Sequence, residues 1–373
     1  MSVKKIGILT FHRAHNYGAM LQAYALLEFL QSKGYRVEII DYWPKELQNE
    51  YLWVPNYPYR STLSRIKGLL WFVLGFSMER KRRAGYVHFI LKYLQLSKQI
   101  RYKTASQLES LNYDVVIYGS DQIWRKHPFT QKFDTVYWGD VPKNVLRKIA
   151  YGASSNTLNF SEDDLAFFRN KLKNFYSVGL REKEFGEVLK EYYERPINIV
   201  LDPVFLIDTN VWQNLSLEAN IKLPNRPYLL FYHLNYNPHI VKKVEQIARL
   251  LKLSVLEIRG RVFPLKVGSR YCQTASPIDF LKLINHADCV ITNSFHGTAL
   301  SILFQKEFYV VGANKGSHRI KNLLETLSLE NRFFSDNINL LTDAIDYKKV
   351  FLTIEILQNQ SREFLLRSIE GNI

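Results

Sequence analysis

Titratable side chains in this chain come directly after short apolar runs, at positions where parallel strands would end. Asp121 follows the run YDVVIYG, Arg181 follows YSVGL, and His296 comes shortly after CVIT. A carboxylate at a strand end is well placed to act as a general base for a hydroxyl, and a histidine beside small residues to donate a proton near neutral pH. An arginine offers a fork of donors that matches a carboxylate or a phosphate. These residues together predict acid–base chemistry on an anionic substrate.

Each of these side chains also has a structural interpretation that the sequence leaves open. Asp121 and His296 are both suited to capping a helix that starts after the strand. Arg181 and Arg319, which follows the last strand of the second half, are equally suited to surface ion pairs. Asp202 is interpreted as structural, because the proline after it fixes the exit of the chain from a strand.

A second group of residues has the character of a sugar or anion site. Asn16, Tyr17 and Gly18 form either a turn with a helix cap or a segment whose following backbone N–H groups face a ligand. Trp124 is either a core residue or a platform on which a sugar ring stacks. Ser154 follows the run KIAYGA and lies at another predicted strand end.

The first half of the chain alternates between strands and helices, which predicts a parallel sheet. Strands are expected at residues 5–11, 37–41, 113–119, 148–153, 176–180 and 197–201. Helices are expected at residues 19–33, 161–175 and 182–193, the second of them with Ser161 as its N-cap. After Trp212 the alternation is interrupted by a stretch rich in serine, asparagine and proline. We therefore predict an N-terminal domain over residues 1–213, with an insertion at about 45–105.

The same alternation restarts in residues 214–345. Strands are expected at residues 228–233, 254–258, 289–292 and 307–311, and helices at 238–252, 277–286, 297–304 and 318–328. A C-terminal helix is expected within residues 346–373. The predicted fold class is therefore α/β, with two Rossmann-like doubly wound domains facing each other across a cleft. Ligands in such folds bind beyond the carboxyl ends of the strands.

The net charge of +15 comes mostly from one segment. Residues 60–103 contain eleven basic residues, and Glu79 is their only acidic neighbour. Their mixture of aliphatic, aromatic and basic residues fits a helix lying in an anionic membrane interface. The alternative is an amphipathic helical hairpin that covers the N-terminal sheet and keeps its arginines in water.

Several classes of protein are excluded by what the sequence lacks. No GxxxxGK[ST], GxGxxG, HExxH, CxxC or GxSxG is present, and the two cysteines support neither a disulfide scaffold nor a four-cysteine zinc site. No metal or other cofactor is expected. We expect no signal peptide and no membrane-spanning segment, because the longest apolar run covers residues 69–76 only. The expected location is the cytoplasm, with a possible peripheral place at the inner face of the membrane.

Six segments resemble the polysaccharide pyruvyl transferase family in order and spacing: TFHRAHNYGAMLQAYAL, VVIYGSDQIW, IAYGASS, LREKE, LDPVFL and TNSFHGTALSILF. The resemblance runs from residue 8 to about residue 330. It implies a glycosyltransferase-B-like architecture and transfer of the pyruvyl unit of phosphoenolpyruvate onto a sugar, with release of phosphate. The implied acceptor belongs to a bacterial-type surface polysaccharide of the capsule or exopolysaccharide kind, or to its lipid-linked repeat unit. The chain departs from the family at Gly179, where a serine is usual.

The resemblance also implies roles for individual residues. His296 is expected to be the catalytic acid and Asp121 the base for the acceptor hydroxyl. The carboxylate and phosphate of phosphoenolpyruvate need cationic and polar partners, expected to be Arg181, Arg319, Lys315 and Ser294. The acceptor is expected to contact Asn16, Tyr17, Gly18, Trp124 and Ser154.

Three other functions stay open at this point. A nucleotide-sugar-dependent glycosyltransferase has the same architecture. A non-catalytic capsule-assembly protein would have kept the fold and lost the chemistry, although Asp121, Arg181 and His296 argue against this. A nucleic-acid-binding protein is suggested by the basic pI near 9.5. We do not expect nucleic acid as a partner, because the charge is confined to one segment and no binding module is visible.

Overall fold

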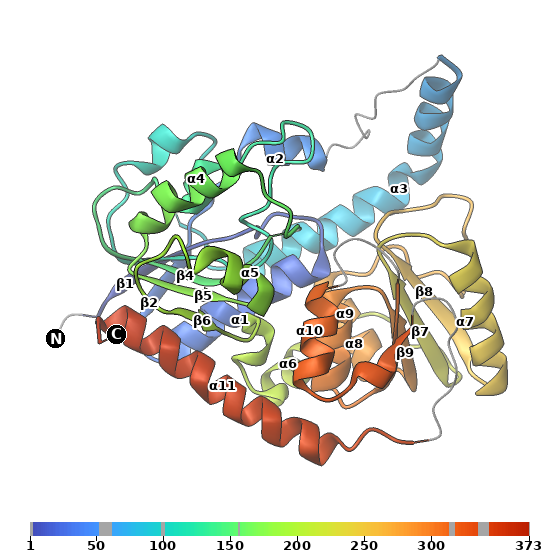
Figure 1. Ribbon diagram of the computed structural model, residues 1–373. Helices are drawn as coiled ribbons and strands as arrows, with labels where there is room; N and C mark the ends of the chain where they lie inside the picture. The colour runs from blue at the N-terminus through green and yellow to red at the C-terminus, as the bar shows by residue number, and fades with distance from the viewer. Residues whose placement is uncertain are drawn as a thin grey trace.

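Two parallel sheets form the centres of two α/β domains that lie side by side (Figure 1). The computed structural model describes residues 3–51, 62–97, 101–155, 157–312, 318–334 and 343–372. Lys315, one of the predicted donor-binding residues, lies outside the described residues. All ten strands expected from the sequence are present, with ends shifted by up to about three residues, so the predicted fold class is confirmed.

The N-terminal sheet has the order β2-β1-β3-β4-β5-β6, and every strand pair in it is parallel. Its strands are β1 (Lys5–Leu9), β2 (Arg36–Ile39), β3 (Tyr113–Tyr118), β4 (Val145–Ala153), β5 (Ser177–Leu180) and β6 (Ile197–Ile199). Its helices include α1 (Tyr17–Ser32), α2 (Lys45–Glu50), α4 (Glu162–Lys171) and α5 (Lys183–Leu189). Ser161 caps α4 through a capping box, as the sequence predicts.

The C-terminal sheet has the order β11-β10-β9-β7-β8 and is also parallel. Its strands are β7 (Tyr228–His233), β8 (Ser254–Arg259), β9 (Cys289–Thr292), β10 (Glu307–Val311) and the short β11 (Phe333–Phe334), which the sequence did not predict. Its helices are α7 (Pro238–Leu250), α8 (Pro277–Asn285), α9 (Phe295–Leu303) and α10 (His318–Thr326). Since the strands are parallel, the loops that carry the predicted site residues leave each sheet at one edge.

Two helices join the domains. The domain boundary predicted at residues 213/214 falls inside α6 (Thr209–Leu217), which packs against α8. The C-terminal helix α11 (Tyr347–Glu370) returns to the N-terminal domain, where the hydroxyls of Ser177 and Ser368 are 2.8 Å apart. A Cβ atom at Gly179 would lie 2.6 Å from the Phe364 ring of α11. This close approach explains why glycine stands where the family usually has serine.

The basic segment forms one continuous helix, α3 (Thr62–Tyr93), so the predicted hairpin is wrong. Tyr86 of α3 is fully buried, and its ring lies 5.4 Å from that of Tyr17 in α1. Arg82 is also buried and donates a hydrogen bond of 2.9 Å to the backbone oxygen of Gly260 in the C-terminal domain. The helix therefore bridges the two domains instead of covering the N-terminal sheet. No helix among the described residues is both long enough and apolar enough to cross a membrane.

Candidate functional site

Loops from both domains bring charged side chains together between the two sheets. Asp121, Arg181 and Asp202 follow strands β3, β5 and β6 of the N-terminal domain. His296 lies in the first turn of α9, and Arg319 in the first turn of α10, both in the C-terminal domain. Ion-pair distances of 3.9 Å or less connect these five residues across the domain boundary. The candidate active site therefore lies where loops of the two domains meet.

Asp202 holds the centre of this cluster. Its Oδ2 atom accepts a hydrogen bond from Nη1 of Arg181 and lies 3.5 Å from Nε2 of His296. Burial alone would raise the pKa of Asp202, but the neighbouring His296 and Arg181 lower it well below its usual range. Asp202 is therefore a carboxylate, and it is positioned to orient a histidine that belongs to the other domain.

Asp121 faces the two arginines from the other side. Its Oδ1 atom is 3.8 Å from Nη2 of Arg181 and 3.9 Å from Nη1 of Arg319, and its side chain is 17% exposed. The backbone at Asp121 has a φ of +76°, in the left-handed region that aspartate tolerates better than most residues other than glycine. This carboxylate thus remains reachable from the cleft.

Several donors in the cluster have no hydrogen-bond partner within the part of the chain that the structure describes. They are Nε and Nη2 of Arg181, Nε of Arg319 and Nε2 of His296. Burial, and then the like charge of Arg181, lower the pKa of Arg319. Both guanidinium groups also lie within 6 Å of the centre of the Phe295 ring. Buried donors are normally satisfied, so two guanidinium groups with spare N–H bonds have the capacity to bind an anion.

The loop before α1 fits tightly against the catalytic histidine expected from the sequence. A Cβ atom at Gly18 would fall far inside contact distance of Nδ1 of His296, so only glycine fits at this position. Asn16 caps α1 by accepting hydrogen bonds from the backbone N–H groups of Gly18 and Ala19. The N-terminal domain therefore approaches His296 through the backbone of α1.

Comparisons with known proteins agree with this geometry. The family model for polysaccharide pyruvyl transferase matches residues 16–314. The chain belongs to this family. A comparison with curated proteins gives no match. The predicted family is thus confirmed, and with it the expectation that this member of a transferase family is an enzyme.

Solved structures support the two-domain architecture of this pyruvyl transferase family member. UDP-GlcNAc 2-epimerase from Methanocaldococcus jannaschii superposes with a TM-score of 0.50 at 11% identity, over 98% of this chain and 99% of that chain. UDP-GlcNAc 2-epimerase from Neisseria meningitidis, bound to UDP-GlcNAc, has a TM-score of 0.50 at 8% identity, over 99% and 100% of the two chains. These enzymes have the glycosyltransferase-B fold, and at such low identity the similarity concerns the fold alone.

Two predicted acceptor contacts of the pyruvyl transferase are wrong. The Trp124 ring is fully buried and stacks on Trp138 with 4.2 Å between ring centres, so no sugar can stack on it. Tyr17 is also buried, stacks on Phe280 and donates its hydroxyl to the backbone oxygen of Ala275. Trp124 is therefore a core residue, and Tyr17 holds the two domains together.

The two serines predicted to bind ligands, Ser154 and Ser294, form hydrogen bonds within the protein. Ser154 is buried and donates its hydroxyl to Oε1 of Glu182 at 2.6 Å. Ser294 accepts a 3.4 Å hydrogen bond from the N–H of Gly297 and so caps α9, the helix that carries His296. Both serines thus position neighbours of the cleft.

The sequence underestimated Asp202 and did not single out Ser120 or Glu182 as site residues. Ser120 donates its hydroxyl to the backbone oxygen of Gly152 and lies 3.3 Å from Oδ2 of Asp202. Burial raises the pKa of Glu182, and its Oε2 atom has no hydrogen-bond partner in the described structure. The signal for Asp202 was present in the LDPVFL motif, but its proline favoured a structural interpretation.

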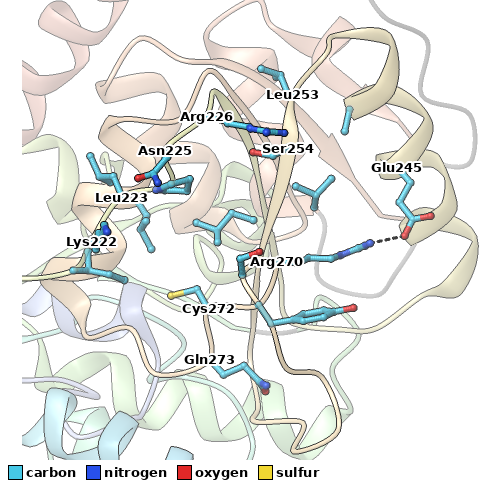
Figure 2. A pocket seen from close by; sticks show the side chains of 18 of the residues that line it. Lys222, Leu223, Asn225, Arg226, Glu245, Leu253, Ser254, Arg270, Cys272 and Gln273 are labelled. Carbon is cyan, nitrogen blue, oxygen red and sulfur yellow. Dashed lines mark hydrogen bonds and ion pairs between the residues drawn. The ribbon is translucent and has the colours of Figure 1, made fainter.

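A separate groove of about 960 Å³ runs along the edge of the C-terminal sheet (Figure 2). Arg270 pairs with Glu245 there at 2.7 Å. Burial raises the pKa of Cys272 to about 11, so its thiol stays protonated at neutral pH. The residues that line this groove come from the C-terminal domain and its linker and include none of the predicted site residues. It is therefore not the catalytic cleft of the pyruvyl transferase. Among the described residues, no group of His, Cys, Asp and Glu side chains is arranged to hold a metal ion.

Proposed function

We propose that the chain transfers the pyruvyl unit of phosphoenolpyruvate onto a sugar. The observation that carries this proposal is the pair of arginines, Arg181 and Arg319, which both lie within 3.9 Å of Asp121 and keep N–H groups without a hydrogen-bond partner in the described structure. They belong to the same ion-pair cluster as His296. Phosphoenolpyruvate has a carboxylate and a phosphate, and each suits a guanidinium fork. The donor binds with its anionic groups on these arginines and its methylene carbon toward His296.

The proposed reaction uses one acid and one base on opposite sides of the cleft. His296 gives a proton to the methylene carbon, and the oxygen of a first sugar hydroxyl bonds to the neighbouring carbon while Asp121 takes its proton. The carbon–oxygen bond to phosphate then breaks, and phosphate leaves with the bonding electron pair and with the proton that Asp121 had taken. A second hydroxyl of the same sugar closes the ketal, and its proton restores His296. The arginines stabilise the negative charge of the leaving phosphate.

The acceptor is proposed to enter from the N-terminal domain, because Asp121 belongs to that domain. A cavity of about 340 Å³ adjoins the Asp121 loop and is lined by aromatic and polar side chains, among them Phe11, Tyr42, Arg125 and Asp134. Aromatic faces with a few polar groups are typical of small-ligand sites. This cavity takes the place of Tyr17 and Trp124 as the proposed binding surface for the sugar.

The proposed acceptor is a sugar of a surface polysaccharide, of the capsule or exopolysaccharide kind, carried on a lipid. This follows from membership of the family, whose acceptors include saccharides on lipid carriers. Incubation with phosphoenolpyruvate and lipid-linked oligosaccharides is expected to release phosphate and to add the mass of a pyruvate ketal. The absence of both phosphate release and a mass increase would show that the acceptor is another sugar, whereas phosphate release without a mass increase would show hydrolysis of phosphoenolpyruvate in place of transfer.

The donor can be tested without knowing the acceptor. A ligand that binds only the folded state raises the apparent melting temperature, so phosphoenolpyruvate is expected to stabilise the protein at millimolar concentration. The Neisseria relative was solved with UDP-GlcNAc, and this nucleotide sugar is therefore the matched comparison. Stabilisation by UDP-GlcNAc but not by phosphoenolpyruvate would replace this proposal with a nucleotide-sugar glycosyltransferase.

A further inference from the structure

The first half of helix α3 carries a row of exposed apolar side chains. Ile66, Leu69, Leu70, Val73 and Leu74 are each between 50% and 62% exposed. Their spacing of three and four residues places them on one face of the helix. Figure 1 shows this end of α3 projecting beyond the body of the protein. Contiguous exposed apolar surface of this kind marks a binding site.

The opposite face of α3 is held against the C-terminal domain. The Trp71 ring packs edge-on against Phe263 at 5.9 Å, and a Cβ at Gly75 would lie only 2.9 Å from the Pro264 ring. Arg82, further along the same face, is anchored to Gly260 as described above. The apolar row is therefore exposed although the helix as a whole has a packing partner. One face is packed, and the other is left at the surface.

The loop that holds α3 also exposes large apolar side chains near this end of the helix. Leu265 and Val267 lie directly after Phe263 and Pro264, which contact the helix, and both are 69% exposed. Two segments almost 200 residues apart in sequence thus place large apolar side chains at one end of the molecule. We call the five α3 residues together with Leu265 and Val267 the apical surface.

The charges around the apical surface have one sign. Arg80, Lys81 and Lys266 border the apical surface and are exposed. The nearest acidic residue of α3, Glu79, is paired with Arg83 at 2.6 Å. Two copies of this surface facing each other would bring like charges together, whereas an anionic surface complements them.

We propose that the apical surface docks the protein onto an anionic lipid membrane. The apolar row inserts among the acyl chains near the headgroups, and Arg80, Lys81 and Lys266 contact the lipid phosphates. The apolar row spans about 12 Å of helix, enough to enter the interface and too short to cross a bilayer. This surface lies outside the catalytic cleft, so the inference does not depend on the proposed function.

Vesicle flotation with the full-length chain tests this proposal. The wild-type protein is expected to float with vesicles that contain phosphatidylglycerol and to stay in the soluble fraction with pure phosphatidylcholine. The double variant Leu70→Glu/Leu74→Glu is expected to weaken binding at least about tenfold, because it places two anions in the apolar row. The variant Arg80→Gln/Lys81→Gln is expected to weaken binding by a similar factor at low salt.

Helix α11 offers a matched control. Leu352 and Ile356 have the same spacing as Leu70 and Leu74, and similar exposure at 56% and 60%. The variant Leu352→Glu/Ile356→Glu is therefore expected to bind vesicles like the wild type. Equal losses in both double variants, or no wild-type flotation with anionic vesicles, would overturn the proposal. So would a wild-type dimer that Leu70→Glu/Leu74→Glu separates in sedimentation, because the apical surface would then bind a second copy.

Discussion

The protein contains two groupings of a histidine, an aspartate and an arginine, one within the N-terminal domain and one across the domain boundary, and they differ in how completely they are satisfied. In the first, His12 bonds the backbone oxygen of Thr10 at 3.1 Å and Asp41 at 3.0 Å. Arg13 donates two hydrogen bonds to the same carboxylate, at 2.5 and 2.7 Å. Burial would raise the pKa of Asp41, but these bonds lower it to about 2. Every group in this first grouping has its partner within the domain.

The second grouping is formed by Arg181, Asp202 and His296. It has the same three residue types, but its hydrogen bonds are incomplete. His296 comes from the other domain and stays 3.5 Å from the carboxylate, while Arg181 keeps two N–H-bearing atoms without a partner in the described structure. We call the first grouping saturated, because all of its hydrogen-bonding groups have partners, and the second unsaturated. A saturated grouping stabilises a fold, and an unsaturated one retains the capacity to bind a ligand. Residue type alone therefore does not distinguish a structural triad from a catalytic one. The following predictions test this comparison.

Replacing the two histidines is expected to give opposite effects. His296→Ala should reduce turnover by about 10²-fold or more, the usual scale for a lost general acid, and change stability little. His12→Gln should lower the free energy of unfolding by about 2 kcal/mol, because it breaks a buried hydrogen bond to a charge, and leave the turnover of the folded enzyme unchanged. Steady-state kinetics and urea unfolding measure the two effects. Near-full turnover of His296→Ala would show that His296 is only a helix residue.

Gly18→Ala is expected to damage the unsaturated grouping without touching its charges. The added methyl group must displace His296, and misplacement of a catalytic group by about 1 Å can cost up to about 10²-fold in rate. Ala19 is already an alanine in the same first turn of α1, so helix propensity is not the cause of any loss. Unchanged kcat would mean that His296 can move away without losing its function.

Arg319→Gln is expected to weaken phosphoenolpyruvate binding about 30-fold, because one charge-assisted pair of hydrogen bonds is lost. The shift in melting temperature with phosphoenolpyruvate measures this effect. Arg13→Gln is the matched control, since Arg13 belongs to the saturated grouping. Equal shifts in wild type and Arg319→Gln would place the donor elsewhere in the cleft.

Much of this site was predictable, since parallel strands of one sheet end at the same edge. Asp121, Arg181, His296 and Arg319 were all identified in this way, because each follows a predicted strand. Trp124 was misjudged, because an aromatic residue after a strand has the same sequence pattern whether its ring faces the cleft or turns under the sheet. The Trp138 ring that covers it comes from a single 3₁₀ turn, Thr135–Trp138, which the sequence did not predict.

The path of α3 was not predictable for a related reason. Its composition indicates a helix with an apolar and a basic character, and the structure confirms a helix. What fixes its position is the loop around Phe263 and Pro264, almost 200 residues further along the chain. A local sequence pattern does not predict which distant loop will pack against a given face of a helix.

A third histidine, His15 in the loop between β1 and α1, gives the smallest predicted effect and sharpens the comparison, because the contacts described for it include no carboxylate. His15 stacks on Tyr86, and burial, followed by the charges of Arg83 and Arg82, lowers its pKa to about 3. Between pH 6.5 and 3 the unfolded chain therefore binds a proton at this position that the folded chain does not. Stability must fall as the pH decreases through this range.

Between pH 8 and pH 6, His15 is expected to remove about 1 kcal/mol from the free energy of unfolding. The variant His15→Gln cannot titrate there, so its stability should fall by about that much less than the wild type over the same interval. Urea unfolding of both proteins at the two pH values measures the difference, with His88→Gln at an exposed position of α3 as the control. Identical losses in wild type and His15→Gln would mean that His15 is protonated in the folded protein, and that a histidine in this loop needs no carboxylate to carry a charge.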